Sequence, residues 1–264
     1  MPGERLDIML HQQGLADSRE KAKAFILAGR VQVNGQRADK PGQQVTETAV
    51  LTVTGSDNDY ASRGGTKLAG AITAMNIDFD GKIVIDVGAS TGGFTDCALR
   101  HGAVRVYAVD VGYGQLDWKI RQDPRVTVRE RTNIRHVKPE EFPEKMNISV
   151  IDVSFISLTL VLPVVAELLD DHGEVIALVK PQFEAGREQV GKKGVVRDPA
   201  VHKEVLKKVT KAAGNLGLNL VNVCYSPIKG PNGNIEYFVY LKKEKGISSD
   251  ILLDQIVNQA HKQL

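Results

Sequence analysis

Two lysines and two carboxylates occupy positions where a predicted α/β protein builds chemistry. Asp152 ends one apolar run of the sequence, and Lys180 ends another. A charge at the carboxyl end of a buried strand points toward the ligand crevice of an open α/β sheet. Lys67 lies at the start of a predicted helix, and Glu236 lies inside the last predicted strand. A single lysine, aspartate or glutamate usually faces solvent. Here, the occurrence of four such residues at positions where α/β proteins bind ligands indicates a site.

A glycine-rich turn, Asp86–Gly93, follows the β-branched run that begins at Lys82. A segment of helical periodicity comes directly after it. A strand, a glycine turn and a helix form the first unit of a nucleotide-binding α/β fold, in which ligands bind at the carboxyl ends of the strands. The ligand of this turn therefore decides the function.

A dinucleotide is one candidate ligand. Gly88 and Gly93 match the first and third glycines of the GxGxxG motif, and Asp110 ends the second strand, where a ribose-binding acid belongs. However, the middle glycine, which lets the backbone approach a pyrophosphate, is Ser90 here. S-adenosylmethionine has an adenosine and an amino acid but no phosphate. We therefore favour this cofactor over NAD.

A nucleophile elbow is the second candidate, because residues 88–92 spell GxSxG. A hydrolase would need a strand-end acid and then a histidine, and neither His172 nor His202 follows in that order. A turn that serves packing alone is the third. Only S-adenosylmethionine accounts for both acids of the region, with Asp86 near the methionine amino group and Asp110 on the ribose hydroxyls.

The order of the elements predicts the fold that positions these residues. From Lys82 onward, strands and helices alternate, which predicts a mostly parallel sheet with helices on both faces. We expect strands at 82–87, 104–110, 126–129, 148–153, 174–180, 218–225 and 235–241, and helices at 93–101, 114–122, 158–170 and 199–214. The last two strands have no room for a helix between them and must pair as a hairpin, which makes the final strand antiparallel. A seven-stranded Rossmann-like sheet with an antiparallel terminal strand is typical of class I methyltransferases.

The first 58 residues read as a separate, small α+β unit. Asp17 or Ser18 can cap a helix over 19–27, with Glu20 as a capping-box acid, and Asn34-Gly35 predicts a hairpin turn. The words Arg5-Leu-Asp, Ser-Arg-Glu-Lys-Ala and Gly-Arg-Val-Gln-Val-Asn-Gly resemble an S4 domain, the RNA-binding module of ribosomal protein S4. The resemblance implies an RNA partner, whose phosphates position the RNA. The expected RNA contacts are Arg5, Arg19, Lys23, Arg30 and, beyond the unit, Arg63.

The order Lys67, Asp152, Lys180, Glu236 is similar to the K-D-K-E tetrad of FtsJ-like ribose 2′-O-methyltransferases. The words around it, among them Asp-Val-Ser-Phe-Ile-Ser-Leu and Val-Lys-Pro-Gln-Phe-Glu, resemble the TlyA family, which joins an S4 domain to an FtsJ-like domain and carries haemolysin-like as well as rRNA methyltransferase names. The resemblance implies 2′-O-methylation of cytidine in ribosomal RNA. The expected S-adenosylmethionine contacts are Asp86, Gly88, Ser90, Thr91, Gly92, Gly93, Phe94, Asp110 and Asn133.

The chemistry of methyl transfer suggests a role for each member of this tetrad. An in-line displacement needs a nucleophilic oxygen close to the methyl carbon. A ribose hydroxyl is a poor nucleophile, and a lysine can deprotonate it only where burial and a nearby positive charge disfavour the ammonium form. The cofactor's sulfonium is such a charge beside Lys180. Asp152 and Glu236 would orient the lysines, and Lys67 would help to hold the hydroxyl.

The composition of the chain bears on whether the protein holds disulfides or metals and whether it enters a membrane. The 264 residues carry a net charge of +2, with two distant cysteines and six histidines that show no ligand spacing, so we expect no disulfide and no metal site. No signal peptide and no membrane-spanning run is visible, which predicts a cytoplasmic protein without a membrane partner. We expect a monomer. A haemolysin-like membrane-active protein and a non-catalytic RNA-binding protein are the alternatives to an enzyme.

These interpretations divide the chain into four segments. We expect an S4-like RNA-binding domain over 1–58, a linker over 59–66 and an FtsJ-like methyltransferase domain over 67–246. Residues 247–264 carry apolar residues at helical spacing, which predicts a C-terminal helix packed on the methyltransferase domain.

Overall fold

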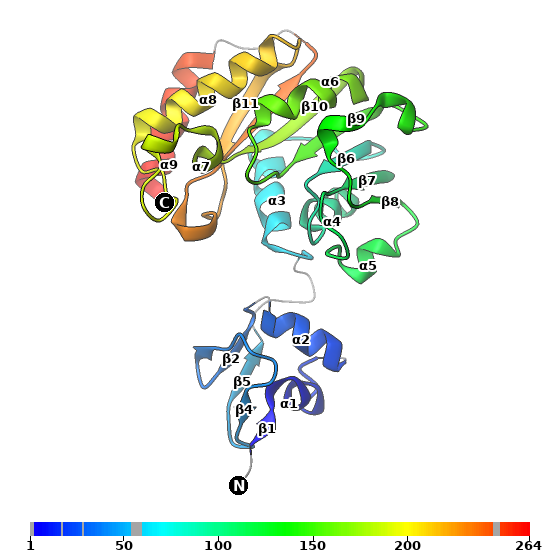
Figure 1. Ribbon diagram of the computed structural model, residues 1–264, viewed down its shortest axis with the longest axis vertical. Helices are drawn as coiled ribbons and strands as arrows, with labels where there is room; N and C mark the ends of the chain where they lie inside the picture. The colour runs from blue at the N-terminus through cyan, green and yellow to red at the C-terminus, as the bar shows by residue number, and fades with distance from the viewer. Residues whose placement is uncertain (1–2, 17, 28, 54–59, 245–248) are drawn as a thin grey trace. The chain divides into compact units, whose positions relative to one another are not determined.

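The computed structural model describes residues 3–16, 18–27, 29–53, 60–244 and 249–264. The chain separates into two compact units, Met1–Asp59 and Tyr60–Leu264 (Figure 1). Each unit has its own hydrophobic core. Among the described residues, no helix combines the length and the apolar composition needed to cross a membrane.

The first unit packs two helices against short strands. Its elements are β1 (Glu4–Arg5), α1 (Leu6–Gln12), α2 (Arg19–Leu27), β2 (Val31–Val33), β3 (Gln36–Arg37), β4 (Gln44–Val45) and β5 (Leu51–Val53). Asn34 and Gly35 have φ values of 51° and 78°, as a tight hairpin between β2 and β3 requires, so the predicted turn is confirmed.

The cap of α2 differs from the expected capping box. The hydroxyl of Ser18 accepts a hydrogen bond from the backbone N–H of Lys21 at 3.1 Å. Lys21 therefore takes the third helical position, which the sequence interpretation had given to Glu20. The alternative cap, Asp17, lies outside the described residues. The helix α1 was not predicted.

The second unit is built on a seven-stranded sheet. Its strands are β6 (Ile83–Val87), β7 (Arg105–Val109), β8 (Val126–Arg129), β9 (Met146–Ile151), β10 (Leu169–Val179), β11 (Asn219–Tyr225) and β12 (Tyr237–Lys242). They lie in the order β11-β12-β10-β9-β6-β7-β8, and β12 runs antiparallel to both of its neighbours. The seven strands and the terminal hairpin are as predicted. The insertion of β12 between β10 and β11 was not.

Helices cover both faces of this sheet, as alternating strands and helices predict (Figure 1). The helices are α3 (Arg63–Met75), α4 (Gly93–Arg100), α5 (Trp118–Arg121), α6 (Leu162–Leu168), α7 (Pro181–Glu184), α8 (Pro199–Gly214) and α9 (Ser249–Gln263). Apolar residues of α3 and α4 form one core with one face of the sheet, and those of α6, α8 and α9 form another core with the opposite face. Short 3₁₀ turns, including one at Leu158–Leu160, complete the connections.

Two element boundaries differ from the prediction in ways that affect the site. The helix α3 begins at Arg63 instead of Lys67, because the hydroxyl of Ser62 caps it by accepting from the N–H of Gly64. Lys67 therefore sits in the second turn of a helix, where its direction is fixed. The strand β12 begins at Tyr237, so Glu236 lies directly before the strand and not inside it.

Candidate active site

Lys180 lies at the carboxyl end of β10 and reaches the residues that follow β9. Its Nζ is 2.6 Å from Oδ1 of Asp152 and donates to Oγ of Ser154 at 3.0 Å. The strands β9 and β10 are parallel neighbours, which brings their carboxyl ends to the same edge of the sheet. Lys180 is only 9% exposed, whereas the side chain of Asp152 is 20% exposed, so the lysine is the more deeply buried partner. The structure thus brings together two of the four predicted residues.

Lys67 and Glu236 form the second ion pair. Nζ of Lys67 lies 2.6 Å from Oε2 of Glu236, and both side chains are buried. The other carboxylate oxygen of Glu236 accepts from Nε2 of Gln182 at 3.3 Å. Gly230 packs against this carboxylate so closely that a Cβ there would lie 2.1 Å from Oε1. Glu236 is therefore held by charge, by an amide and by backbone contact.

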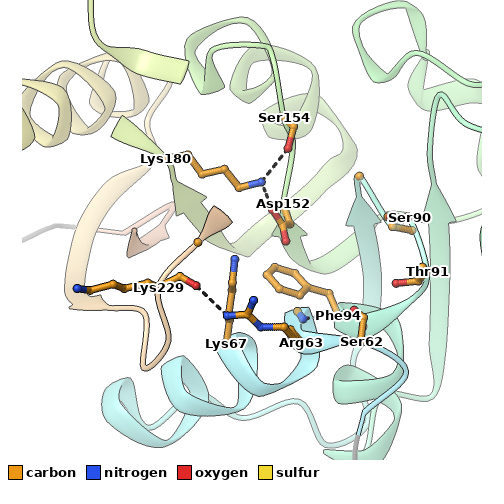
Figure 2. Close-up of a pocket in the computed structure, with 15 residues that line it drawn as sticks. Ser62, Arg63, Lys67, Ser90, Thr91, Phe94, Asp152, Ser154, Lys180 and Lys229 are labelled. Atoms are coloured by element: carbon orange, nitrogen blue, oxygen red, sulfur yellow. Dashed lines mark hydrogen bonds and ion pairs between the residues drawn. The ribbon is translucent and has the colours of Figure 1, made fainter. Parts of the chain in front are cut away.

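A cavity of about 280 Å³ joins the two pairs to the glycine turn. Figure 2 shows Lys180 reaching across it toward Asp152 and Ser154, and Lys67 rising into it from α3. The predicted residues in its lining are Arg63, Lys67, Gly88, Ser90, Thr91, Gly93, Phe94, Asp152 and Lys180. One cavity is thus bordered by lysines, a carboxylate and a glycine turn, and its volume can hold part of a nucleoside.

The glycine turn fits closely under this cavity. Gly88 has a φ of 87°, and a Cβ at this position would lie 2.5 Å from the carbonyl oxygen of Asp152. Gly93 lies where α3 and α4 begin, and a Cβ there would lie 2.2 Å from Oγ of Ser62. Ser90 holds a φ of 48°, which a residue with a side chain rarely adopts. The turn is therefore fixed against its neighbours, with Ser90 at the cavity wall.

Asp86 lies deeper than expected. Its side chain is fully buried, and one oxygen accepts from Oγ1 of Thr95 at 2.6 Å while Oδ1 has no partner among the described residues. Burial raises the pKa of the carboxyl group to about 7; the hydrogen bond from Thr95 opposes this rise, and the nearby Asp152 adds to it. The residue does not border the cavity. A buried carboxyl group with an unpaired oxygen suits a position beneath a cationic group.

Asp110, Asn133 and Gly92 also lie outside the cavity lining. The carboxylate of Asp110 accepts from the N–H of Ser90 at 2.8 Å and from the N–H of Gly112 at 2.6 Å. It is therefore anchored beside the turn. Asn133 caps a 3₁₀ turn, and its oxygen accepts from the N–H of Arg135. Asp110 directly follows β7 and Asn133 lies four residues after β8, so both follow strands that end on the same edge of the sheet as the turn.

The predicted RNA contacts fall in both units. Arg5 and Arg19 both pair with the fully buried Asp7, at 2.9 Å each. The hydrogen bond from Arg5 is the main cause that lowers the pKa of Asp7 to about 2. Lys23 is half-buried on α2, and the guanidinium of Arg30 lies 4.5 Å from the ring centre of Phe25. Arg63 borders the cavity and donates to the carbonyl oxygen of Lys229 at 3.0 Å.

Several residues of the site were not predicted from the sequence. Ser154 binds Lys180, and Gln182 binds Glu236. Phe155 has a φ of 63° and is 90% exposed, and its ring centre lies 4.9 Å from that of Phe183. The signal that could have found Phe155 is its place three residues after a strand-end carboxylate. An exposed aromatic ring at the edge of a site with basic residues is typical of a surface that stacks on a base.

Comparisons with known proteins agree with this geometry. The model of the FtsJ-like methyltransferase family matches residues 60–243, and the S4 domain model matches residues 4–51. YqxC of Bacillus subtilis is 50% identical over 99% of this chain and 95% of its own length. The protein of Mycobacterium tuberculosis named 16S/23S rRNA (cytidine-2′-O)-methyltransferase TlyA is 46% identical over 91% of this chain and 90% of its own. A solved structure from Streptococcus thermophilus, named for a hemolysin, has a TM-score of 0.79 at 46% identity and covers 100% of this chain and 97% of that one.

Proposed function

This chain belongs to the FtsJ-like methyltransferase family, with an S4 domain at its N-terminus, and we propose that it methylates the 2′-hydroxyl of cytidine in ribosomal RNA. The observation that carries the proposal is that Lys180, Asp152 and Lys67 border one cavity beside the glycine turn, with Lys180 paired to Asp152 and Lys67 held from behind by Glu236. The choice of cytidine follows the name of the Mycobacterium tuberculosis relative.

The residues around the glycine turn fit S-adenosylmethionine. The unpaired buried oxygen of Asp86 lies below a turn whose Gly88 leaves no room for a Cβ, and Asp110 is anchored at the turn's edge. We assign the methionine part to the side of Asp86, the ribose to Asp110, and the turn at Gly88–Phe94 to the body of the cofactor. When bound, this cofactor supplies a methyl group on a positively charged sulfur. The positive charge of this sulfur is opposite in sign to that of an ionised carboxylate such as Asp110 or Asp152, both of which lie close to the turn.

The two lysines divide the work on the hydroxyl group. Lys180, held by Asp152 and Ser154, takes the proton of the 2′-hydroxyl in its neutral amine form. Lys180 is buried at the cavity wall, where its nitrogen can face the hydroxyl group. Lys67, fixed by Glu236, donates a hydrogen bond that holds the hydroxyl oxygen in line. The carboxylates keep each nitrogen in place.

An RNA substrate agrees with the rest of the surface. Phe155 and Phe183 form an aromatic pair next to Lys180, whose Nζ lies 5.9 Å from the ring centre of Phe183. Enzymes that act on RNA read unstacked nucleotides by stacking on such rings. The basic residues of the S4 unit, with Lys23 on α2, supply contacts to phosphates that are independent of sequence. We further propose that the protein acts as a monomer, in the cytoplasm, on a ribosomal subunit.

Mass spectrometry of ribosomal RNA nucleosides tests this function. Cells that carry this protein should contain 2′-O-methylcytidine in their ribosomal RNA, and cells from which it is deleted should lose that nucleoside at one or a few positions. A plasmid that encodes the chain should restore it. An unchanged nucleoside profile after deletion would refute the proposal.

A further inference from the structure

Two loops that carry the proposed site contact each other at three successive points. The first, residues 152–158, follows β9. The second, residues 180–184, follows β10 and consists of Lys180 and the four-residue helix α7. At one end, Lys180 binds Asp152 and Ser154. In the middle, the rings of Phe183 and Phe155 meet. At the far end, Glu184 binds Ser157 and Leu158. We call these segments the paired loops.

Glu184 is built into the protein as a clamp. It is 5% exposed, and its Oε2 accepts from Oγ of Ser157 while its Oε1 accepts from the backbone N–H of Leu158, both at 2.6 Å. Hydrogen bonds to an ionised carboxylate are shorter and stronger than those between neutral groups. Nζ of Lys208, on α8, donates to the backbone oxygen of Glu184 at 2.8 Å and lies 3.7 Å from its Oε2. The carboxylate thus fastens the first loop to the second, and α8 holds the second.

The first loop needs such a fastening. Between β9 and the 3₁₀ turn that begins at Leu158, it forms no regular element, and Phe155 holds a left-handed φ of 63°. Residues in this region persist where the surrounding structure over-determines them. Glu184 also satisfies the buried N–H of Leu158, which would otherwise lose its hydrogen bond inside the protein.

We infer that Glu184 is a positioning residue, whose clamp on Ser157 and Leu158 sets the separation of the paired loops at which Lys180 meets Asp152 and Phe155 meets Phe183. This inference rests on the proposed function for its meaning in catalysis. Glu184 itself does not border the cavity, so it acts through the loops and not on the substrate. This role accounts for the burial of Glu184, which lies four residues after the proposed base, Lys180.

Reach and charge can be separated at this position. Glu184→Asp keeps the carboxylate but withdraws it by about 1.5 Å, the length of one carbon–carbon bond, so it cannot hold both partners. Glu184→Gln keeps the reach of the side chain. Its amide oxygen can accept from the N–H of Leu158, and its NH₂ group can donate to Oγ of Ser157. The hydroxyl of Ser157 can then donate its own hydrogen bond to Oγ1 of Thr159, which lies 2.8 Å away. Glu188→Asp, at an exposed glutamate on the same stretch, is the matched control.

The first readout does not depend on the enzyme's reaction. An amine-reactive reagent is applied over a range of pH, and the acylation of each lysine is followed by mass spectrometry. We expect Glu184→Asp to shift the pH profile of Lys180 and to speed its acylation at least fivefold. Lys67 should change less, because it pairs with Glu236 and reaches the paired loops only through the 3.3 Å hydrogen bond from Gln182 to that carboxylate. Glu184→Gln and Glu188→Asp should match the wild-type protein.

The second readout is single-turnover methyl transfer to ribosomal subunits at saturating cofactor and RNA. We expect Glu184→Asp to slow the step at least tenfold with a shifted pH profile, to keep the Kd for S-adenosylmethionine within threefold, and to be rescued by Glu184→Gln. If Lys180 keeps its wild-type profile and rate in Glu184→Asp, or if Lys67 changes as much as Lys180, the inference is wrong. If the wild-type protein transfers no methyl group, the proposed function fails, and the acylation contrast still decides the role of Glu184.

Discussion

Nζ of Lys67 lies 2.6 Å from Oε2 of Glu236, although the two residues are 169 positions apart in the chain. Lys67 belongs to α3, whereas Glu236 directly precedes β12. The amide of Gln182 binds the same carboxylate and lies two residues after Lys180. Gln182 therefore links the pair of Lys67 and Glu236 to the segment that carries Lys180.

This buried pair should reveal itself in stability as well as in activity. Removing one partner leaves the other as an uncompensated buried charge, so Glu236→Leu should lower the free energy of unfolding by about 3–5 kcal/mol. The double variant Lys67→Met/Glu236→Leu should recover most of that loss but show no methyl transfer. Urea denaturation of the two single variants and the double variant measures this. Strictly additive losses would mean that the two side chains do not depend on each other.

Asp86 should make stability depend on pH. Its pKa is about 7 in the folded protein against 3.8 as the ordinary value, so between these values the folded state holds a proton that the unfolded chain has lost. The free energy of unfolding therefore falls as pH rises from about 4 to about 7, by up to about 4 kcal/mol for this group. Asp86→Asn removes the titration.

The difference between the wild-type protein and Asp86→Asn isolates this effect from that of all other groups. Denaturation curves at several pH values should show the wild-type protein losing stability relative to Asp86→Asn across that interval. Parallel curves for the two proteins would show that Asp86 titrates at an ordinary pKa.

Phe155 offers a prediction with opposite effects on stability and function. Its left-handed φ of 63° costs a residue with a Cβ about 1 kcal/mol, so Phe155→Gly should be more stable than Phe155→Ala by about that amount. Stacking on a base contributes about 1–3 kcal/mol, so both variants should lose roughly 5- to 150-fold in kcat/KM for RNA. Thermal unfolding and steady-state methylation measure the two effects. A Phe155→Gly variant with full kcat/KM would exclude the ring from substrate recognition.

The S4 unit should contribute affinity without sequence selectivity. Lys23→Ala removes an expected phosphate contact, so it should weaken RNA binding and reduce the slope of log affinity against log salt by about 1. The rate at saturating RNA should not change. Lys40→Ala, at an exposed lysine of the same unit that is not among the expected contacts, is the control. Equal losses in the two variants would indicate that the unit binds RNA through its general charge.

Local sequence patterns were sufficient for the strands and for the strand-end residues. Asp152 and Lys180 were found because a charge after an apolar run is visible in a single stretch of sequence. The ion pair between them was not predicted, because it depends on β9 and β10 being neighbours in the sheet. The position of β12 between β10 and β11 has the same origin, because a hairpin can join a sheet by either strand.

Other features were missed because local signals conflicted. The start of α3 at Arg63 was hidden by a turn-rich stretch in which Ser62 is the cap. The burial of Asp86 beneath the turn was not predicted, since its place at the end of a strand does not tell which way its side chain points. Glu184 resembles a surface residue in the sequence and is buried by contacts from a distant loop.

The central claim is that Lys180 removes the proton of a ribose hydroxyl in RNA. The most direct measurement incubates unmethylated ribosomal subunits and S-adenosylmethionine carrying a labelled methyl group with the wild-type protein or with Lys180→Ala, and identifies the labelled nucleoside by mass spectrometry. We predict 2′-O-methylcytidine with the wild-type protein and at least a thousandfold lower rate with Lys180→Ala, whose Kd for the cofactor stays within threefold. Label on a base, or wild-type turnover by Lys180→Ala, would contradict the claim.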